Sequence, residues 1–194
     1  MYRIISYRFA LLLLACFWLV GCCGDNNLNN NTSLSSAWLP YNAQQNILFE
    51  GENKEIISFT TTKRLRNQQA TDKVCGAYFI QTEDITLTPS SDPDVQLIFS
   101  FSHEIVLDLK VVNIKTNQVG LEAKFNTVAE NYITHAWRDT YAKEGSVNGQ
   151  NFYQLLQVFG NEISSKLEIA EILYARGSGL VAFRTFTGGW YYIQ

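Results

Sequence analysis

Hydrophobic and polar residues alternate along most of the chain from about residue 37 onward. Residues 95–101, 105–111 and 119–125 carry apolar side chains at every second position. This period buries one face of a strand and leaves the other face in water, which favours an antiparallel sheet. Between these segments no helical period of 3.6 residues is sustained, and residues 131–143 are the nearest helical candidate. We therefore expect an all-β fold: a single antiparallel curved sheet, or a β-sandwich or half-barrel, with little helix.

Turn residues divide the remainder of this region into further strands. Gly51 suits one hairpin turn, and Thr187-Gly188-Gly189 suits the hairpin that closes the chain. A loop is expected at residues 89–94, where Asp92 and Asp94 should be solvated. The other segments expected as strands are residues 47–49, 55–62, 74–80, 84–88, 152–159, 167–175, 180–186 and 190–193.

The first 21 residues have the pattern of a bacterial export signal. Arg3 and Arg8 form a positive n-region, and residues 9–20 form an apolar stretch that is too short for a membrane-spanning helix. The stretch ends in Leu19-Val20-Gly21-Cys22, which resembles the lipobox of bacterial lipoproteins. Cys23 is the alternative acceptor, but Cys22 fits the motif better because a glycine directly precedes it.

The lipobox resemblance implies a lipid-anchored protein of the cell envelope. Residues 1–21 would be removed as a signal peptide, Cys22 would carry diacylglycerol, and residues 22–36 would form a flexible Asn/Ser-rich tether. No aspartate directly follows Cys22, which favours the outer membrane and leaves its periplasmic or surface face open. The pairing of Cys23 with Cys75 also stays open, although two free thiols are favoured.

Length and charge narrow the class of protein further. The chain has 194 residues, so residues 37–194 fit a single β-rich domain. It carries 15 basic and 18 acidic residues, a formal net charge of −3, which argues against nucleic acid as a partner. The partner that the sequence does predict is the membrane, contacted through the N-terminal lipid.

The last part of the chain carries a second resemblance. Residues 171–183 are followed by Gly188-Gly189-Trp190, and residues 147–153 precede them as a strand. Together they resemble a C-terminal signature of lipoproteins of Bacteroidota, from which Leu173 and Ser178 depart. The resemblance implies a curved antiparallel sheet with a closing hairpin, and it implies no catalytic residue.

Candidate catalytic and metal-binding residues are few. His103 lies beside a glutamate, but neighbouring side chains on a strand point to opposite faces. His135 and Asp139 would share a face only if that segment were helical. Ser178 lies in Gly177-Ser178-Gly179, which lacks the spacing of a nucleophile elbow, and no Cys or His spacing of a zinc site occurs. We therefore expect no enzymatic activity, no cofactor and no metal.

Aromatic side chains offer the one constructive hint about binding. The chain has 4 Trp, 10 Tyr and 12 Phe, and core packing is favoured for most of them. Alternate residues of the segment 190–193 point to opposite faces, so its rings cannot all be buried on one side. The side chains predicted as possible contacts to a ligand or partner are Trp38, Trp137, Trp190 and Tyr191.

Three classes of function are compatible with these patterns. The favoured class is a lipid-anchored binding or accessory module that holds an apolar or glycan ligand or docks another envelope protein. The alternative is a purely structural envelope lipoprotein, and an enzyme with a dispersed site ranks last. An aromatic-lined pocket would indicate a ligand, whereas a flat apolar patch of several hundred Å² would indicate docking.

We predict that Cys22 anchors the protein to a membrane. The Cys22→Ala variant loses the thiol that would carry diacylglycerol, and stable anchoring needs two or more acyl chains. Fatty-acid labelling and cell fractionation should show loss of both the label and membrane retention, whereas the matched Cys23→Ala control should keep both. Unchanged retention of the Cys22→Ala variant would contradict the prediction.

Overall fold

The protein divides into a larger and a smaller compact unit. Residues 30–66 and 81–194 belong to the larger unit, and residues 67–80 belong to the smaller one, which holds the end of one long strand and the start of the next. The residues described by the computed structural model are 32–72, 76–102, 105–163 and 167–194.

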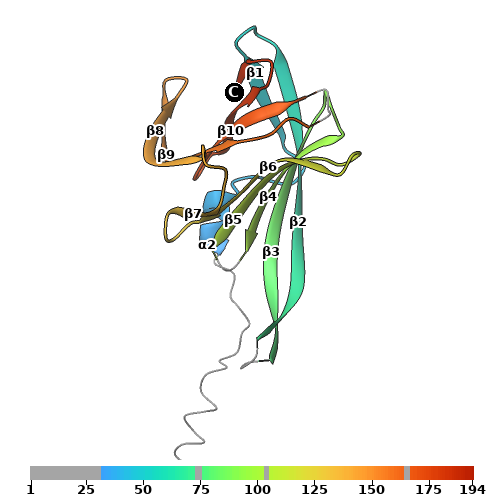
Figure 1. The fold of residues 1–194 in the computed structure, drawn as a ribbon, viewed down its shortest axis with the longest axis vertical. Coiled ribbons are helices and arrows are strands. Elements are labelled where there is room, and N and C mark those ends of the chain that lie inside the picture. Colours follow the sequence, from blue (N-terminus) through green and yellow to red (C-terminus); the bar gives the residue numbers. More distant parts are fainter. Residues whose placement is uncertain (1–31, 73–75, 103–104, 164–166) are drawn as a thin grey trace, which may run out of the picture. The chain divides into compact units, whose positions relative to one another are not determined.

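Strands make up most of the described part of the chain. They form one sheet in the order β7-β6-β5-β4-β3-β2-β1-β12-β11-β10-β9-β8 (Figure 1). The all-β class with a single curved antiparallel sheet and little helix is thus confirmed, and the sheet does not split into a sandwich. The elements in the described ranges are α2 (Thr32–Trp38), β1 (Asn46–Gly51), β2 (Ile56–Asp72), β3 (Gly76–Pro89), β4 (Val95–Ser102), β5 (Val106–Asn113), β6 (Gln118–Asn126), β7 (Asn131–Thr134), β8 (Thr140–Val147), β9 (Gln150–Phe159), β10 (Ile169–Ala175), β11 (Gly179–Thr185) and β12 (Trp190–Ile193).

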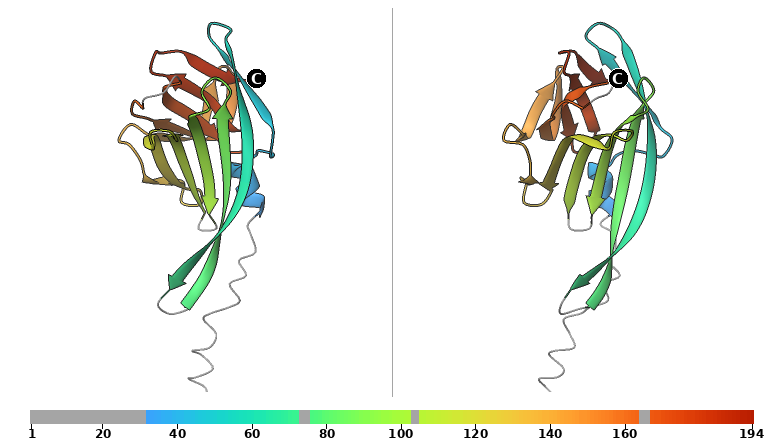
Figure 2. Two further views of the ribbon diagram at one scale, coloured as in Figure 1. Left: turned by 90° about the vertical axis from the view of Figure 1, so that its right-hand side faces the viewer. Right: turned by 45° about the vertical axis from the view of Figure 1, so that its right-hand side comes forward.

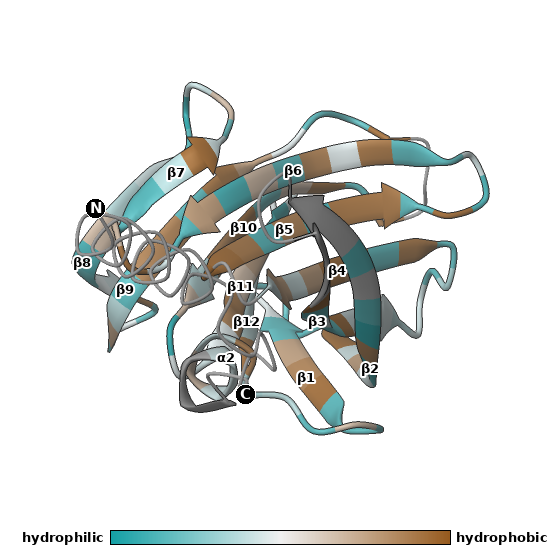
Figure 3. Ribbon diagram, turned by 90° about the horizontal axis from the view of Figure 1, so that it is seen from below, coloured by the Kyte–Doolittle hydropathy of each residue, from teal (hydrophilic) through white to brown (hydrophobic). Residues whose placement is uncertain are grey.

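The predicted alternation of polar and apolar residues sets the register of the sheet. Along β4, fully buried and half-buried positions alternate without interruption. Phe99 of β4 lies opposite Leu109 of β5, which lies opposite Ala123 of β6, and all three are buried. Figure 3 shows the same alternation as brown and teal segments along these strands. A slip by one residue would turn each buried row toward water, so the pattern fixes the pairing.

The first strand of the sheet lies beside the last. In β1, Phe49 pairs with Ile57 of β2 on one side and with Ile193 of β12 on the other. The segments β2–β7 and β8–β12 therefore form two halves of the sheet that are joined through β1. The predicted closing hairpin supplies this junction, because β12 is its second strand.

Within the larger unit the sheet curls until its two ends approach each other. The Tyr132 hydroxyl of β7 donates to the carbonyl oxygens of Thr140 and Gln157, at 2.9 and 3.2 Å. The Asn161 amide donates to the Gly120 carbonyl of β6 at 2.5 Å. These contacts form a seam between β6–β7 and β8–β9, which is closed by side-chain and loop contacts because no β-ladder joins β7 to β8.

Aromatic side chains fill the interior of the curled sheet. Phe99 of β4 and Tyr174 of β10 lie 4.8 Å apart between ring centroids, which brings the two halves together. Figure 2 shows these halves from two sides, with β4–β6 in green to olive and β10–β12 in orange to red. Phe49, Phe59 and Phe183 form a second cluster of edge-to-face pairs. This geometry suits the ring quadrupoles.

The C-terminal end of α2 and the segment that follows it plug this interior. Trp38 is 0% exposed and packs on Phe125, with ring centroids 5.7 Å apart. The Tyr174 hydroxyl donates to the Trp38 carbonyl, and the Leu180 amide donates to the Tyr41 hydroxyl. The curled sheet therefore depends on residues that precede its first strand.

Three parts of the structure differ from the sequence-based prediction. Helix α2 includes residues 32–36, which were predicted to belong to the tether. It is attached to the sheet because the Gly177 amide donates to the Ala37 carbonyl at 2.6 Å. The helical candidate at residues 131–143 forms β7 and the first half of β8, since Tyr132 and Tyr141 both pack on Phe125. Strand β3 is continuous where two strands were expected.

The predicted signal peptide, Cys22 and the other tether residues up to 31 lie outside the described residues, as does Cys75.

We predict that Gly179→Ala destabilises the protein more than Gly177→Ala does. Both glycines have a positive φ, 76° and 81°, so alanine costs about 1–2 kcal/mol of backbone strain at either position. A Cβ at Gly179 would also collide with the buried Tyr41 hydroxyl, whereas a Cβ at Gly177 meets nothing within 4 Å. Overpacking of this kind adds about 1–3 kcal/mol. Denaturant unfolding of the two variants measures the difference, and equal destabilisation would show that the Tyr41 contact is not tight.

Candidate functional site

A cleft of about 580 Å³ opens in the larger unit beside the C-terminal end of α2. It lies at the seam, because its walls come from the turn between β6 and β7, from β8 and β9, and from the turn between β10 and β11. We name it the Glu130 cleft. The residues that line it are Ala37, Glu130, Lys143, Glu144, Tyr153, Gln154, Arg176 and Gly177.

Two residues of the Glu130 cleft have a left-handed backbone although neither is glycine. Glu130 has φ 53° and Gln154 has φ 50°. Glu130 ends a turn in which the Asn126 side-chain oxygen accepts the amides of Val128 and Ala129, at 3.0 and 2.8 Å. Gln154 lies in β9 directly before Leu155, where pairing with β10 begins. Such conformations cost about 1–3 kcal/mol each and cluster at functional sites, and here two of them face the same cleft.

The polar side chains of the cleft form a continuous chain of contacts. The Gln154 Nε2 donates to Glu130 Oε1 at 2.7 Å, and Arg176 Nη1 donates to Gln154 Oε1 at 2.9 Å. Lys143 Nζ lies 3.5 Å from Glu130 Oε2. The hydrogen bond from Gln154 is the main cause that lowers the pKa of Glu130. The cleft thus holds an ionised carboxylate at neutral pH, fixed between an amide and a lysine.

One tyrosine lines the cleft, and a second interacts with the residues that line it. The Tyr153 ring is 68% exposed at the wall. The Tyr141 hydroxyl is buried beside Glu130 and Gln154, and both side chains act on its pKa through hydrogen bonds. Burial raises the pKa of Tyr141, and the neighbouring Glu130 charge adds to the effect. Tyr141 thus belongs to the same group of interacting side chains as Glu130 and Gln154.

The arrangement offers both hydrogen-bond donors and acceptors around one aromatic ring. Lysine and arginine donate, the glutamates accept, and glutamine does both. The lining holds two acidic and two basic residues, so it carries no net charge. This chemistry suits an uncharged ligand that is rich in hydroxyl groups.

The four aromatic residues predicted as contacts lie elsewhere. Trp38 and Tyr191 belong to the core: Trp38 is fully buried, and Tyr191 stacks on Phe183 with centroids 4.9 Å apart. The Trp38 ring is therefore not accessible at the surface, and the Tyr191 ring is half-buried. Trp137 is 89% exposed, and Trp190 lies half-buried on the other face of β12, beside Tyr192. None of the four lines the Glu130 cleft.

Sequence reasoning missed the cleft because its residues come from five separate segments. The segment that resembles the lipoprotein signature does contain Tyr153, Arg176 and Gly177. That resemblance assigned them no role, and no spacing pattern connects them with Glu130 or Lys143. Only the folded seam brings them together.

The other candidates for chemistry have structural surroundings. Asp139 is buried, and its carboxylate accepts the amides of Ala136 and Phe159 at 2.8 and 2.9 Å. Burial raises the pKa of Asp139. His135 is exposed and packs on the Tyr132 ring, with centroids 5.1 Å apart. Ser178 lies in the tight turn before β11, and His103 lies outside the described residues.

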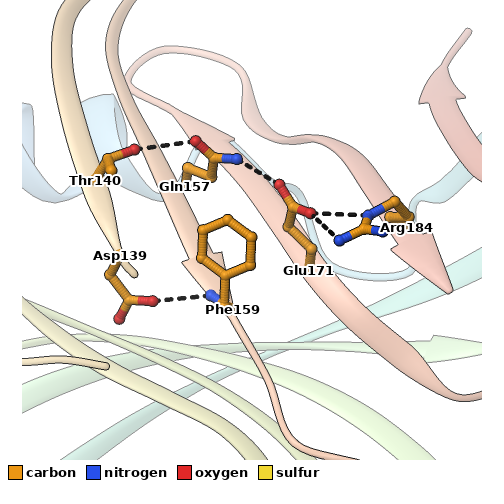
Figure 4. A network of polar contacts seen from close by, with 6 residues as sticks. All are labelled: Asp139, Thr140, Gln157, Phe159, Glu171 and Arg184. Atoms are coloured by element: carbon orange, nitrogen blue, oxygen red, sulfur yellow. Dashed lines mark hydrogen bonds and ion pairs between the residues drawn. The ribbon is translucent and has the colours of Figure 1, made fainter. Parts of the chain in front are cut away.

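A buried ion pair lies at the centre of a polar network across β8–β11 (Figure 4). Glu171 is 2% exposed, and its carboxylate accepts Arg184 Nε at 2.9 Å and Gln157 Nε2 at 2.5 Å. Gln157 in turn accepts the Thr140 hydroxyl at 3.0 Å. Every strand of the group contributes one member, so the network ties β8–β11 together rather than presenting a reactive group.

Neither a metal site nor a membrane-spanning helix is found in the described ranges. There, no three His, Cys, Asp or Glu side chains are grouped so as to hold a metal ion. Nor is any described helix long and apolar enough to cross a bilayer. Comparison with known proteins found no matching family model, no matching curated protein and no matching solved structure.

We predict that Arg184→Met destabilises the protein by about 2–3 kcal/mol, because it leaves the buried Glu171 carboxylate uncompensated. The guanidinium is partly exposed, which keeps the expected loss at the lower end. The double variant Glu171→Met/Arg184→Met removes both charges and should recover most of the loss. Thermal unfolding of the two variants tests this, and a double variant no more stable than the single one would contradict it.

Proposed function

We propose that this protein is a lipid-anchored envelope protein whose Glu130 cleft binds a neutral glycan. The observation that carries the ligand is the cleft itself: a fixed carboxylate, an amide and a guanidinium beside an exposed Tyr153 ring. The observation that supports the location is the lipobox-like sequence that ends at Cys22.

The chemistry of the cleft favours a sugar over an acyl chain. Each sugar hydroxyl both donates and accepts, which matches the alternation of Lys143, Glu130, Gln154 and Arg176. The apolar C–H face of a pyranose ring can pack on Tyr153, which contributes aromatic area at little entropic cost. An acyl chain would instead remove water from these polar groups and offer them no hydrogen bond in return.

The same features favour a small ligand over a docked protein. A docking module would present a broad apolar patch, whereas the Glu130 cleft is concave and has convergent polar groups. The two left-handed residues add to this argument, because such conformations persist only where the surrounding structure fixes the backbone, which positions the polar side chains before a ligand arrives.

We predict that Tyr153→Ala weakens sugar binding by about tenfold, since loss of one ring contact is worth about 1 kcal/mol or slightly more. Cellotriose, chitotriose and maltotriose serve as neutral probes in calorimetric titrations of the full chain. Trp137→Ala is the matched control, because it removes an exposed aromatic ring that lies outside the cleft.

The pH dependence of the same titration reports on Glu130. Because its pKa is lowered, affinity should stay constant through the usual glutamate range near pH ~4.3 and fall only below it. Gln154→Ala removes the hydrogen bond and should move this fall to higher pH. No binding of any of the three sugars, or binding that Tyr153→Ala leaves unchanged, would contradict the proposed function.

A further inference from the structure

A tight turn between β7 and β8 presents an exposed tryptophan and arginine side by side. The Asp139 amide donates to the Ala136 carbonyl at 3.0 Å, and the Ala136 amide donates back to Asp139 Oδ2 at 2.8 Å. The other carboxylate oxygen accepts the Phe159 amide at 2.9 Å, which fixes the turn to β9. The two residues at the tip, Trp137 and Arg138, therefore project from a rigid support.

Trp137 is the most exposed of the large hydrophobic side chains in the described residues, at 89%. Val128 and Ile133, in the preceding turn and in β7, are each more than half exposed as well. Tryptophan is normally well buried because its ring area is large. A rigid turn that holds such a ring in water implies that something covers the ring during function.

Arg138 shows what kind of chemistry suits the tip. Its guanidinium carbon lies 4.9 Å from the centroid of Phe159 and 6.0 Å from that of Trp137. No carboxylate within the described ranges forms a salt bridge with it. The tip thus combines an apolar ring with a cation available to an anion.

The size of the tip argues against a protein partner. A stable protein interface needs about 800 Å² from each side, whereas one tryptophan supplies at most about 250 Å². The residues around the tip include exposed Asn131, Thr134 and His135, which do not extend an apolar surface. A bilayer surface has no such area requirement, because single aromatic rings settle at the headgroup level.

We propose that the Trp137–Arg138 turn docks on the phospholipid surface, with the indole ring at the headgroup boundary and the guanidinium on a phosphate. Arginine pairs with phosphate through two parallel hydrogen bonds. Docking would add a second contact to the lipid anchor and restrict how the domain is oriented on the bilayer. This inference rests on the proposed membrane attachment and is independent of the glycan site.

The test measures the depth of Trp137 in vesicles. The lipidated mature protein, which begins at Cys22 and lacks Trp18, is reconstituted into phosphatidylcholine vesicles with one fifth phosphatidylglycerol, and flotation first establishes its attachment. Lipids brominated on the acyl chains near the headgroup then quench tryptophans that lie at this depth. The wild-type protein should show a quenched component, and Trp137→Phe should remove it. The control Trp190→Phe, which replaces a half-buried tryptophan, should leave the quenched component unchanged.

A charge variant tests the role of the arginine. Arg138→Glu should shift the ratio of docked to undocked Trp137 about tenfold or more toward undocked, because each basic residue near an anionic surface is worth about 1 kcal/mol and the new acid is repelled. Lys115→Glu is the control for the change of charge, because Lys115 is exposed. Arg184 is unsuitable as a control because it belongs to the buried polar network.

The possible outcomes separate this inference from the proposed function. Flotation without quenching of Trp137 overturns the docking and leaves the lipid anchor intact. A chain that fails to float refutes the membrane attachment and the docking with it, whereas sugar binding in solution is unaffected by either result. Protection of Trp137 from acrylamide by lipid-free envelope protein, but not by vesicles, would assign the tip to a protein partner and overturn the proposal.

Discussion

A single sheet can bury its inner face only by curling around it, and the interior that results must be filled. Most of the filling comes from the rings and aliphatic side chains of the strands themselves. The remaining space is taken by Trp38, Leu39 and Tyr41, which enter from outside the sheet and bond to the β10–β11 hairpin. The hydrophobic effect thus couples the N-terminal segment to a hairpin near the opposite end of the sequence.

The seam where the sheet meets itself also creates the candidate site. Its two sides are joined by Tyr132, Asn161 and Asp139 and not by a ladder. Side-chain bonding leaves room between the strands, and the Glu130–Gln154 pair occupies part of it. A fully laddered barrel would have no such gap, so the cleft follows from incomplete closure of the sheet.

The sequence predicts the strands well and the long-range contacts poorly. The alternation of polar and apolar residues located β4–β6 and the closing hairpin, because burial of one face of a strand produces this alternation directly. It missed β8, whose only strong apolar anchors are Tyr141 and Val147. It placed Asp92 in solvent, although this carboxylate is buried and accepts the Leu167 amide at 3.0 Å. It likewise did not find the Glu130 cleft. Local patterns cannot encode partners that are 75 residues apart.

The position of β1 has a consequence for how the chain reaches its structure. Because β1 is flanked by β12, the two halves of the sheet share no ladder until the last strand, Trp190–Ile193, has been made. Contacts between the chain's beginning and its end are slow to form, since a long loop must close first. Until residues 190–193 are in place, β1 and β11 therefore each keep an open strand edge. The closing hairpin thus decides when the sheet is complete, and a change that weakens β12 leaves both halves with an unpaired edge.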